Sequence, residues 1–246
     1  MKSILLSNDD GINAEGLKTL RNVLSGIAHV FVVAPDRERS AGSHSLTINT
    51  DLMFEEIGPD IFSLTGTPAD CVIYALDKLL VNPPDLVISG INHGSNVGDD
   101  IMYSGTVAAA REAARHGIPA IAVSQNYNDA NKIRFEKGGE FIRGMVKTIL
   151  DGSLNGEFLL NVNIPVGKIK GMKITRQGYS EHPKHFSEDE TNLSPTTNQF
   201  NFQGNSLITD KIAVFDGYVS ITPLQRDQTD YAAARLLAKA AERGGF

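Results

Sequence analysis

Residues 4–24 read ILLSNDDGINAEGLKTLRNVL, and this stretch decides the fold class. An apolar run of strand length is followed by a polar turn, and then by leucines and a valine at helical spacing. This order predicts the first β–α unit of an α/β domain.

The polar turn carries two adjacent carboxylates, Asp9 and Asp10, at the predicted end of the strand. In open α/β sheets this edge binds ligands. Neighbouring side chains of an extended chain point apart, so the two carboxylates can converge on one ion only in a tight turn, which Gly11 permits. This stretch alone is equally compatible with a plain turn beside a helix N-cap.

The same alternation of strands and helices continues over the first two thirds of the 246 residues. We expect strands at 30–34, 85–91, 120–124 and 158–164, a hairpin-like pair within 46–64, and helices at 68–80, 107–116 and 135–150. The pattern is typical of an α/β fold with a doubly wound, mostly parallel sheet. We therefore divide the chain into a core, 1–165, and a C-terminal extension, 166–246.

The extension contains short strand candidates at 172–175, 212–215 and 218–221, which we expect to include a β-hairpin, and a terminal helix from Asp230. Between them lies a polar stretch, 182–204, that is long for a compact domain and carries Phe186, Phe200 and Phe202. We interpret residues 168–225 as an arm that packs on another subunit. The alternative is a surface loop.

Composition excludes several function classes. A net charge of −6 disfavours a binder of nucleic acid polymers or of membrane surfaces, because basic patches recruit those partners. The one cysteine, Cys71, cannot form an internal disulfide, and neither a signal segment nor a long apolar span is evident, so we expect a cytoplasmic protein. Cys71 lies in a predicted helix start, where a packing role is expected.

Three predicted strand ends carry oxygen donors: Asn8 to Asp10, Arg37 to Ser40, and Asn92 with Asn96. Carboxylate, hydroxyl and amide oxygens without a thiolate suit one hard divalent ion, Mg²⁺ or Mn²⁺, better than zinc. His44 and His93 are close in sequence and could act as ligands or as acid or base. We favour solvated loop histidines for both.

A fourth element, Tyr103-Ser104-Gly105-Thr106, opens a predicted helix. Free first-turn N–H groups, a glycine and two hydroxyls can receive a phosphate, although Ser or Thr is more commonly an ordinary N-cap. The P-loop and dinucleotide-binding glycine motifs do not occur at the first βα turn, and the Gly-x-Ser-x-Gly hydrolase elbow is missing.

Six motifs are spread over nearly the whole chain: ILLSNDDG (4–11), VAPDRERSAGSHSLT (33–47), GTPADC (66–71), PDLVISGINHGSNVG (84–98), YSGTVAAA (103–110) and GYVSITP (217–223). Together they resemble the survival protein SurE family of metal-dependent 5'/3'-nucleotidases. The resemblance implies metal ligands at Asp9, Asp10, Ser40 and Asn92, and a phosphate near Asn96, Ser104, Gly105 and Thr106. It also implies a Rossmann-like core and an extension exchanged between subunits of a homodimer or homotetramer. Ala41 departs from the family pattern, which usually has glycine there.

The residues and the resemblance lead to a phosphomonoesterase acting on nucleoside 5'- and 3'-monophosphates, and on short polyphosphate as a further substrate. Asp9 and Asp10 are its expected catalytic residues, holding the ion near an attacking water. The mechanistic alternative is an aspartyl-phosphate. The functional alternative is a nucleotide-binding stress sensor without turnover.

Overall fold

The computed structural model describes residues 1–127, 133–179 and 207–243. Its centre is one nine-stranded sheet with the order β3-β4-β2-β1-β5-β6-β7-β9-β8. The strands are β1 (Ser3–Ser7), β2 (His29–Pro35), β3 (Phe54–Gly58), β4 (Ile61–Leu64), β5 (Leu86–His93), β6 (Ala120–Gln125), β7 (Leu159–Ile164), β8 (Met172–Ile174) and β9 (Val219–Leu224). The six strands from β4 to β7 in this order are mutually parallel, which confirms the predicted mostly parallel α/β sheet.

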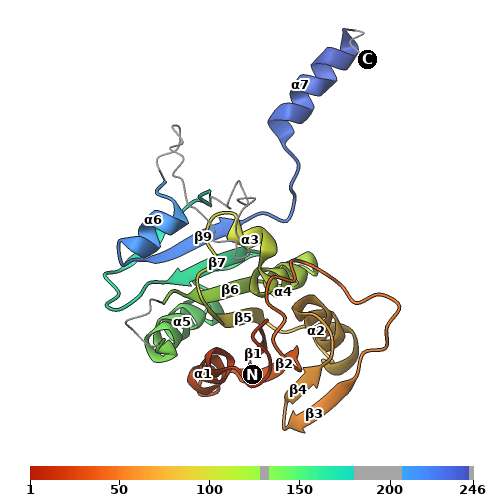
Figure 1. Cartoon of the computed structure of the whole chain (residues 1–246), viewed down its shortest axis with the longest axis vertical. Helices are drawn as coiled ribbons and strands as arrows, with labels where there is room; N and C mark the ends of the chain where they lie inside the picture. The colour runs from red at the N-terminus through yellow and green to blue at the C-terminus, as the bar shows by residue number, and fades with distance from the viewer. Residues whose placement is uncertain (128–132, 180–206, 244–246) are drawn as a thin grey trace, which may run out of the picture.

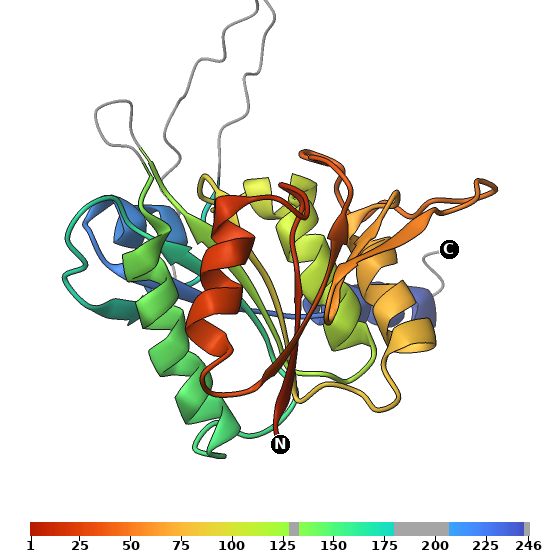
Figure 2. The ribbon, with the colours of Figure 1, turned by 90° about the horizontal axis from the view of Figure 1, so that it is seen from below.

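Helices cover both faces of the sheet, as Figure 2 shows. On one face α1 (Glu15–Leu24) and α5 (Phe135–Leu150) pack their apolar stripes against one side of the sheet. On the other face lie α2 (Pro68–Tyr74), continued by the π-helical turn η1 (Ala75–Leu79), and α4 (Gly105–Arg115). The strands at the centre are almost wholly apolar because both of their faces are buried.

Local sequence signals explain several helix boundaries. Thr67 caps α2, its hydroxyl accepting from the N–H of Asp70, and Pro68 occupies the first helical position. Cys71 is fully buried in this helix, which confirms its packing role. Burial raises the pKa of the Cys71 thiol well above its ordinary value, so a reactive thiolate is disfavoured.

The C-terminal part differs from the prediction in two respects. The strand predicted at 212–215 is wrong, because Thr209 caps the helix α6 (Asp210–Phe215) there. The expected hairpin pairing is also absent among the described strands, since β8 runs parallel to β9 while β9 pairs antiparallel with β7. Both strands thus lengthen the central sheet, and the division at residue 165 stays a prediction.

In the first part of the chain, the strand expected from residue 46 begins only at Phe54. The preceding segment is instead fastened to α2, where the Asp70 carboxylate accepts hydrogen bonds from the N–H and the hydroxyl of Thr47. Phe186, Phe200 and Phe202, the expected anchors of the arm, lie outside the described residues.

The terminal helix α7 (Tyr231–Glu242) begins as predicted at Asp230, whose carboxylate accepts from the N–H groups of Ala232 and Ala233. None of its residues is buried, and Figure 1 shows it standing away from the sheet and its helices. In the parts of the chain that the structure describes, no helix combines the length and apolarity needed to cross a membrane.

Candidate functional site

The carboxyl ends of β1 and β5 meet at the point where the order of the strands reverses. The chain leaves β1 for β2 on one side and later returns on the other side as β5. Ligands of doubly wound sheets bind in the crevice at such a switch point. Since Ser7 pairs with Ser89, the turn with Asp9 and Asp10 after β1 and the end of β5, which carries Asn92, emerge at one edge.

The turn after β1 has the tight geometry that the sequence predicts. Gly11 has φ +96°, in the left-handed region that favours glycine, and its carbonyl oxygen accepts from the Asn8 amide at 2.9 Å. A Cβ on Gly11 would lie 3.0 Å from the backbone carbonyl carbon of Arg37. The N–H of Arg39 donates to the carbonyl oxygen of Asp9 at 2.7 Å. The loop after β2 is thus fastened to the turn after β1.

Asp9 lies between this turn and the start of α4. Its side chain is only 4% exposed, and its Oδ1 accepts from the hydroxyl of Thr106 at 2.5 Å. A Cβ on Gly105 would lie 2.8 Å from the Asp9 Cβ, so only glycine lets the helix approach this closely. Burial raises the pKa of Asp9, although the Thr106 hydroxyl and the N–H groups of Thr106 and Gly105 stabilise the carboxylate.

Asp10 is the more exposed of the two carboxylates, and its Oδ2 accepts from the N–H of His93 at 3.2 Å. This contact joins the turn after β1 to the end of β5. Burial and the neighbouring charge of Asp9 raise the pKa of Asp10 to about 6. The carboxylate pair is therefore costly to ionise without a cation.

The other two expected metal ligands form hydrogen bonds within their own loops. The Ser40 hydroxyl is exposed and donates to Glu38 Oε1 at 2.7 Å, and the Asn92 amide nitrogen donates to the carbonyl oxygen of Gly94 at 2.9 Å. The Asn92 bond occupies the nitrogen and leaves the side-chain oxygen as a donor atom for an ion. Their assignment as ligands stays a prediction.

Ala41, the departure from the family pattern, has φ +56°. This is the left-handed region, which costs a residue with a Cβ roughly 1–2 kcal/mol. A glycine would relieve that cost. The position next to Ser40 thus has a backbone conformation that glycine adopts more readily.

Ser104 caps the N-terminus of α4, which is the ordinary one of the two roles that the sequence allowed for it. The Ser104 hydroxyl accepts from the N–H of Val107 at 3.0 Å, and the helix begins at Gly105. Together with the contacts of Thr106 and Gly105 to Asp9, this places the N-terminus of an eleven-residue helix against a carboxylate. A phosphate role for these residues stays a prediction.

Asn96 is held in a buried network of amides that the sequence analysis did not identify. Its N–H donates to Asn163 Oδ1 at 2.8 Å, and its carbonyl oxygen accepts from the amides of Asn161 and Asn163. Its side-chain nitrogen donates to Ser124 Oγ at 2.7 Å. These bonds fix the position of Asn96, and its role in phosphate binding stays a prediction.

The loop after β5 is also held from the C-terminal part of the chain. The fully buried Asp210 carboxylate accepts at 2.9 Å from the N–H of Gly98 and at 2.9 Å from that of Gly178. The Gln177 amide donates to the carbonyl oxygen of Gly98 at 2.9 Å. Burial raises the pKa of Asp210 in spite of these donors. Both backbone groups of Gly98 are thus fixed by residues far along the chain.

The two loop histidines have different environments. His93 is exposed, as expected. His44 is instead paired with the buried Glu112 of α4 at 2.9 Å, so its expectation as a solvated histidine is wrong. Glu112 also accepts a hydrogen bond from the Arg115 side chain at 3.1 Å. Burial alone would raise the pKa of Glu112, but His44 and Arg115 stabilise the carboxylate and hold its pKa below the ordinary value. The pairing fastens the loop after β2 to α4.

The carboxylate pair fits a divalent cation. Within residues 1–127, 133–179 and 207–243, no lysine, arginine or histidine side chain forms an ion pair with Asp9 or Asp10. The same residues contain no group of three or more His, Cys, Asp or Glu side chains arranged to hold a metal. A site here would therefore combine two carboxylates with hydroxyl and amide oxygens, which are donors that Mg²⁺ and Mn²⁺ accept.

The sequence analysis did not identify Asn161, Asn163 and Asp210, and only the first two could have been found from the sequence. Asn161 and Asn163 alternate within the apolar strand LLNVNI, which places two amides on one buried face of β7, and this spacing could have indicated them. Asp210 gave no comparable signal, because its importance lies in a contact with a loop 112 residues earlier.

Comparison with known proteins agrees with the motifs. The family model described as survival protein SurE matches residues 4–184. A 5'-nucleotidase SurE from Syntrophotalea carbinolica is 37% identical over 243 residues, with 96% of each chain covered. One from Vibrio campbellii is 42% identical, covering 95% of this chain and 92% of its own.

A solved structure shows the same architecture. The crystal structure of the SurE protein from Aquifex aeolicus superimposes with a TM-score of 0.85 at 38% sequence identity. The match covers 97% of this chain and 99% of that protein. The mostly parallel sheet, the motifs at its switch point and these similarities lead to one conclusion: the chain belongs to the survival protein SurE family.

Proposed function

We propose that this protein is a metal-dependent phosphomonoesterase that hydrolyses nucleoside 5'- and 3'-monophosphates to nucleoside and phosphate. The observation that carries the proposal is the pair of adjacent carboxylates at the switch point, with which no Lys, Arg or His side chain of the described residues forms an ion pair. The name 5'-nucleotidase that the relatives carry supports the same reaction.

Four residues are proposed to hold one Mg²⁺ or Mn²⁺: Asp9, Asp10, Ser40 and Asn92. When bound, such an ion supplies positive charge at the phosphate oxygens and acidifies water. The hydrogen bond from the Thr106 hydroxyl fixes the orientation of the Asp9 carboxylate, and the backbone N–H of His93 does the same for Asp10. Positioning of this kind is the main contribution of a protein to phosphoryl transfer.

The phosphate is proposed to lie among Asn96, Ser104, Gly105 and Thr106. The positive end of the α4 dipole lies at Gly105 and favours an anion beside Asp9. The orientation of Asn96 is fixed by its buried partners, so this residue needs no reordering when substrate binds. Short polyphosphate offers the same terminal group and is included as a substrate.

Direct attack by water is proposed over an aspartyl-phosphate, because two adjacent carboxylates are better explained as ligands of one ion. Rapid acid quenching of the reaction with AMP labelled at phosphorus tests this choice. We expect the label in free phosphate only. Label retained on the denatured protein would establish the covalent route.

Phosphate release separates the enzyme from a stress sensor without turnover. We expect free phosphate from AMP and GMP with Mn²⁺ present, and none in excess chelator. Tight nucleotide binding without phosphate release under the same conditions would instead establish the sensor.

We also propose a cytoplasmic homodimer or homotetramer. The cytoplasm suits a chain whose one cysteine is buried and has a raised pKa.

Oligomer formation is supported by α7, which buries none of its residues and exposes 69% of Leu236 and 58% of Leu237. We expect the double substitution Leu236→Glu and Leu237→Glu to lower the sedimentation coefficient. Val81→Glu is the control, because Val81 is also apolar and 96% exposed but lies outside α7. Equal coefficients for all three proteins would refute the role of α7.

A further inference from the structure

Two exposed aromatic rings stand beside the carboxylates and have no role in the proposed chemistry. The rings of His93 and Tyr127 lie with centroids 4.6 Å apart and planes tilted by 39°. Tyr127 remains 47% exposed, and His93 is exposed as well. His93 is the last residue of β5 and Tyr127 follows β6, so the pair spans two neighbouring strand ends.

The backbone fixes this aromatic pair in place. The N–H of Gly94 donates to the carbonyl oxygen of Gln125 at 2.9 Å and ties the two chain segments together. Gly94 has φ +110°, and a Cβ there would lie 3.6 Å from Tyr127 Cε1. The glycine thus leaves the edge of the phenol ring uncovered. A ring held by its backbone is already ordered when a ligand arrives.

The pair is also fixed relative to the proposed reaction site. His93 follows Asn92 directly, and its N–H donates to Asp10 Oδ2 at 3.2 Å. A group that packs on the His93 and Tyr127 rings is therefore attached to the same backbone that holds the carboxylates. In a nucleotide only the ribose separates the base from the phosphate.

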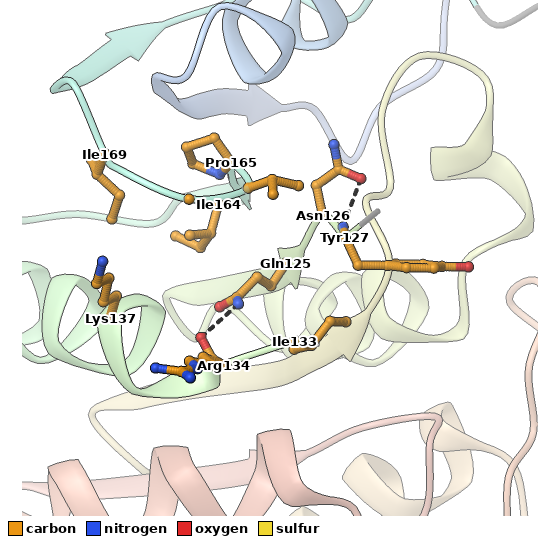
Figure 3. A pocket seen from close by; sticks show the side chains of 11 residues that line it. Gln125, Asn126, Tyr127, Ile133, Arg134, Lys137, Ile164, Pro165 and Ile169 are labelled. Atoms are coloured by element: carbon orange, nitrogen blue, oxygen red, sulfur yellow. Dashed lines mark hydrogen bonds between the residues drawn. The ribbon is translucent and has the colours of Figure 1, made fainter. Parts of the chain in front are cut away.

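A cavity of about 410 Å³ opens next to Tyr127, within the size range of small-molecule sites. Its lining includes the apolar side chains of Ile133, Ile164 and Ile169 and the amides of Gln125 and Asn126. Tyr127 is among the lining residues, and Figure 3 shows its ring projecting outward, away from Ile164 and Ile169.

We propose that the exposed rings of His93 and Tyr127 form a stacking platform for the base of a nucleotide substrate, at the edge of this cavity. The inference rests on the proposed function and extends it from the phosphate to the nucleoside. Stacking on an aromatic face accepts every base, because each base has a π-face. The platform therefore selects nucleotides over other phosphomonoesters, with little discrimination among bases.

The test compares AMP with ribose 5-phosphate, which has the same phosphate and sugar without a base. The quantity measured is the ratio of the two kcat/KM values, with Mn²⁺ present. Tyr127→Ala should lower this ratio by about 5- to 150-fold, the range expected from loss of one base–aromatic stack. Tyr127→Phe keeps the π-face and should keep the ratio. An unchanged ratio in Tyr127→Ala would overturn the platform.

A binding measurement distinguishes failure of the platform from failure of the proposed function. Titration calorimetry with adenosine needs no turnover, and we expect binding to wild type and Tyr127→Phe that is weakened in Tyr127→Ala. If wild type releases phosphate from neither ester, the phosphatase assignment fails and this titration alone decides the platform. Equal adenosine binding by all three proteins overturns it. If Tyr127→Ala does not fold, Tyr127→Leu replaces it, because leucine keeps the bulk and lacks the π-face.

Discussion

Replacing Gly105 by alanine probes the contact between α4 and Asp9 without changing any charge or hydrogen-bonding group. The added methyl would lie 2.8 Å from the Asp9 Cβ and 2.9 Å from its Oδ2, closer than real Cβ atoms approach other heavy atoms. Asp9 cannot move away easily, because it is 4% exposed and its other oxygen is bound by Thr106. The helix or the carboxylate must therefore shift.

The expected magnitude follows from two opposing effects. Overpacking of a filled site costs typically about 1–3 kcal/mol. Replacing a helical glycine by alanine stabilises the folded state by about 0.4–1 kcal/mol, because it lowers the conformational entropy of the unfolded chain. The net loss is about 1–2 kcal/mol, or about 2–8 °C in the thermal midpoint for a chain of this size. A displacement approaching 1 Å at the carboxylate lowers kcat/KM about 100-fold.

Gly144 of α5 provides the matched control. A Cβ built there meets nothing within 4 Å, so Gly144→Ala should raise stability by about 0.5–1 kcal/mol and leave activity unchanged. Thermal unfolding and phosphate release from AMP with Mn²⁺ are measured for both variants. If Gly105→Ala matched Gly144→Ala in midpoint and in kcat/KM, the close contact with Asp9 would have no functional importance.

Four further substitutions test separate parts of the site. Asp9→Asn and Asp10→Asn should abolish Mn²⁺-dependent phosphate release while the metal-free midpoint stays or rises, because each removes one charge of a self-repelling pair; near-normal turnover would refute the metal assignment. Asp210→Asn should lower stability by about 1–3 kcal/mol in denaturant unfolding and reduce kcat/KM, since the amide keeps one oxygen and leaves the N–H of Gly98 or of Gly178 without an acceptor. Full activity would show that Gly98 needs no such anchor. Because the pKa of Glu112 is lowered in the folded protein, this residue adds stability that is fully present above pH 4.5 and is lost as the pH falls through the folded pKa. Glu112→Gln should therefore weaken the fall of the thermal unfolding midpoint at acid pH.

The parts of the fold that were predicted from sequence are those specified by local patterns. The segment from β1 through Gly11 to α1 combines an apolar run, a turn residue and helical spacing within 21 residues, and each signal agrees with the others. The error at 212–215 has the opposite cause. Four apolar residues fit a strand or a helix equally well, and the deciding signal, Thr209 as an N-cap, lies outside that window.

The candidate site shows the same division between local and distant information. Residue types and strand ends indicated that Asp9, Asp10 and Asn92 lie at one edge, because the topology of an α/β sheet determines where strand ends meet. The reason for Gly105 could not be predicted, since its close contact is with a residue 96 positions earlier. Sequence indicated a glycine for approach to a phosphate, whereas the structure shows approach to a carboxylate.

The loop after β5 links the C-terminal part of the chain to the site, because the buried backbone groups of this loop need hydrogen-bond partners. Gly98 is buried, so its N–H and its carbonyl oxygen each need a partner, and Asp210 and Gln177 supply them. Two residues before Gly98, Asn96 is held by amides of β7, whose other edge is paired with β9. Because an unpaired buried group costs about 1–3 kcal/mol, the position of this loop is specified from both sides of residue 165. Residues beyond 165 therefore act on the site through the backbone of the loop that carries Asn96, whether or not they also contact another subunit.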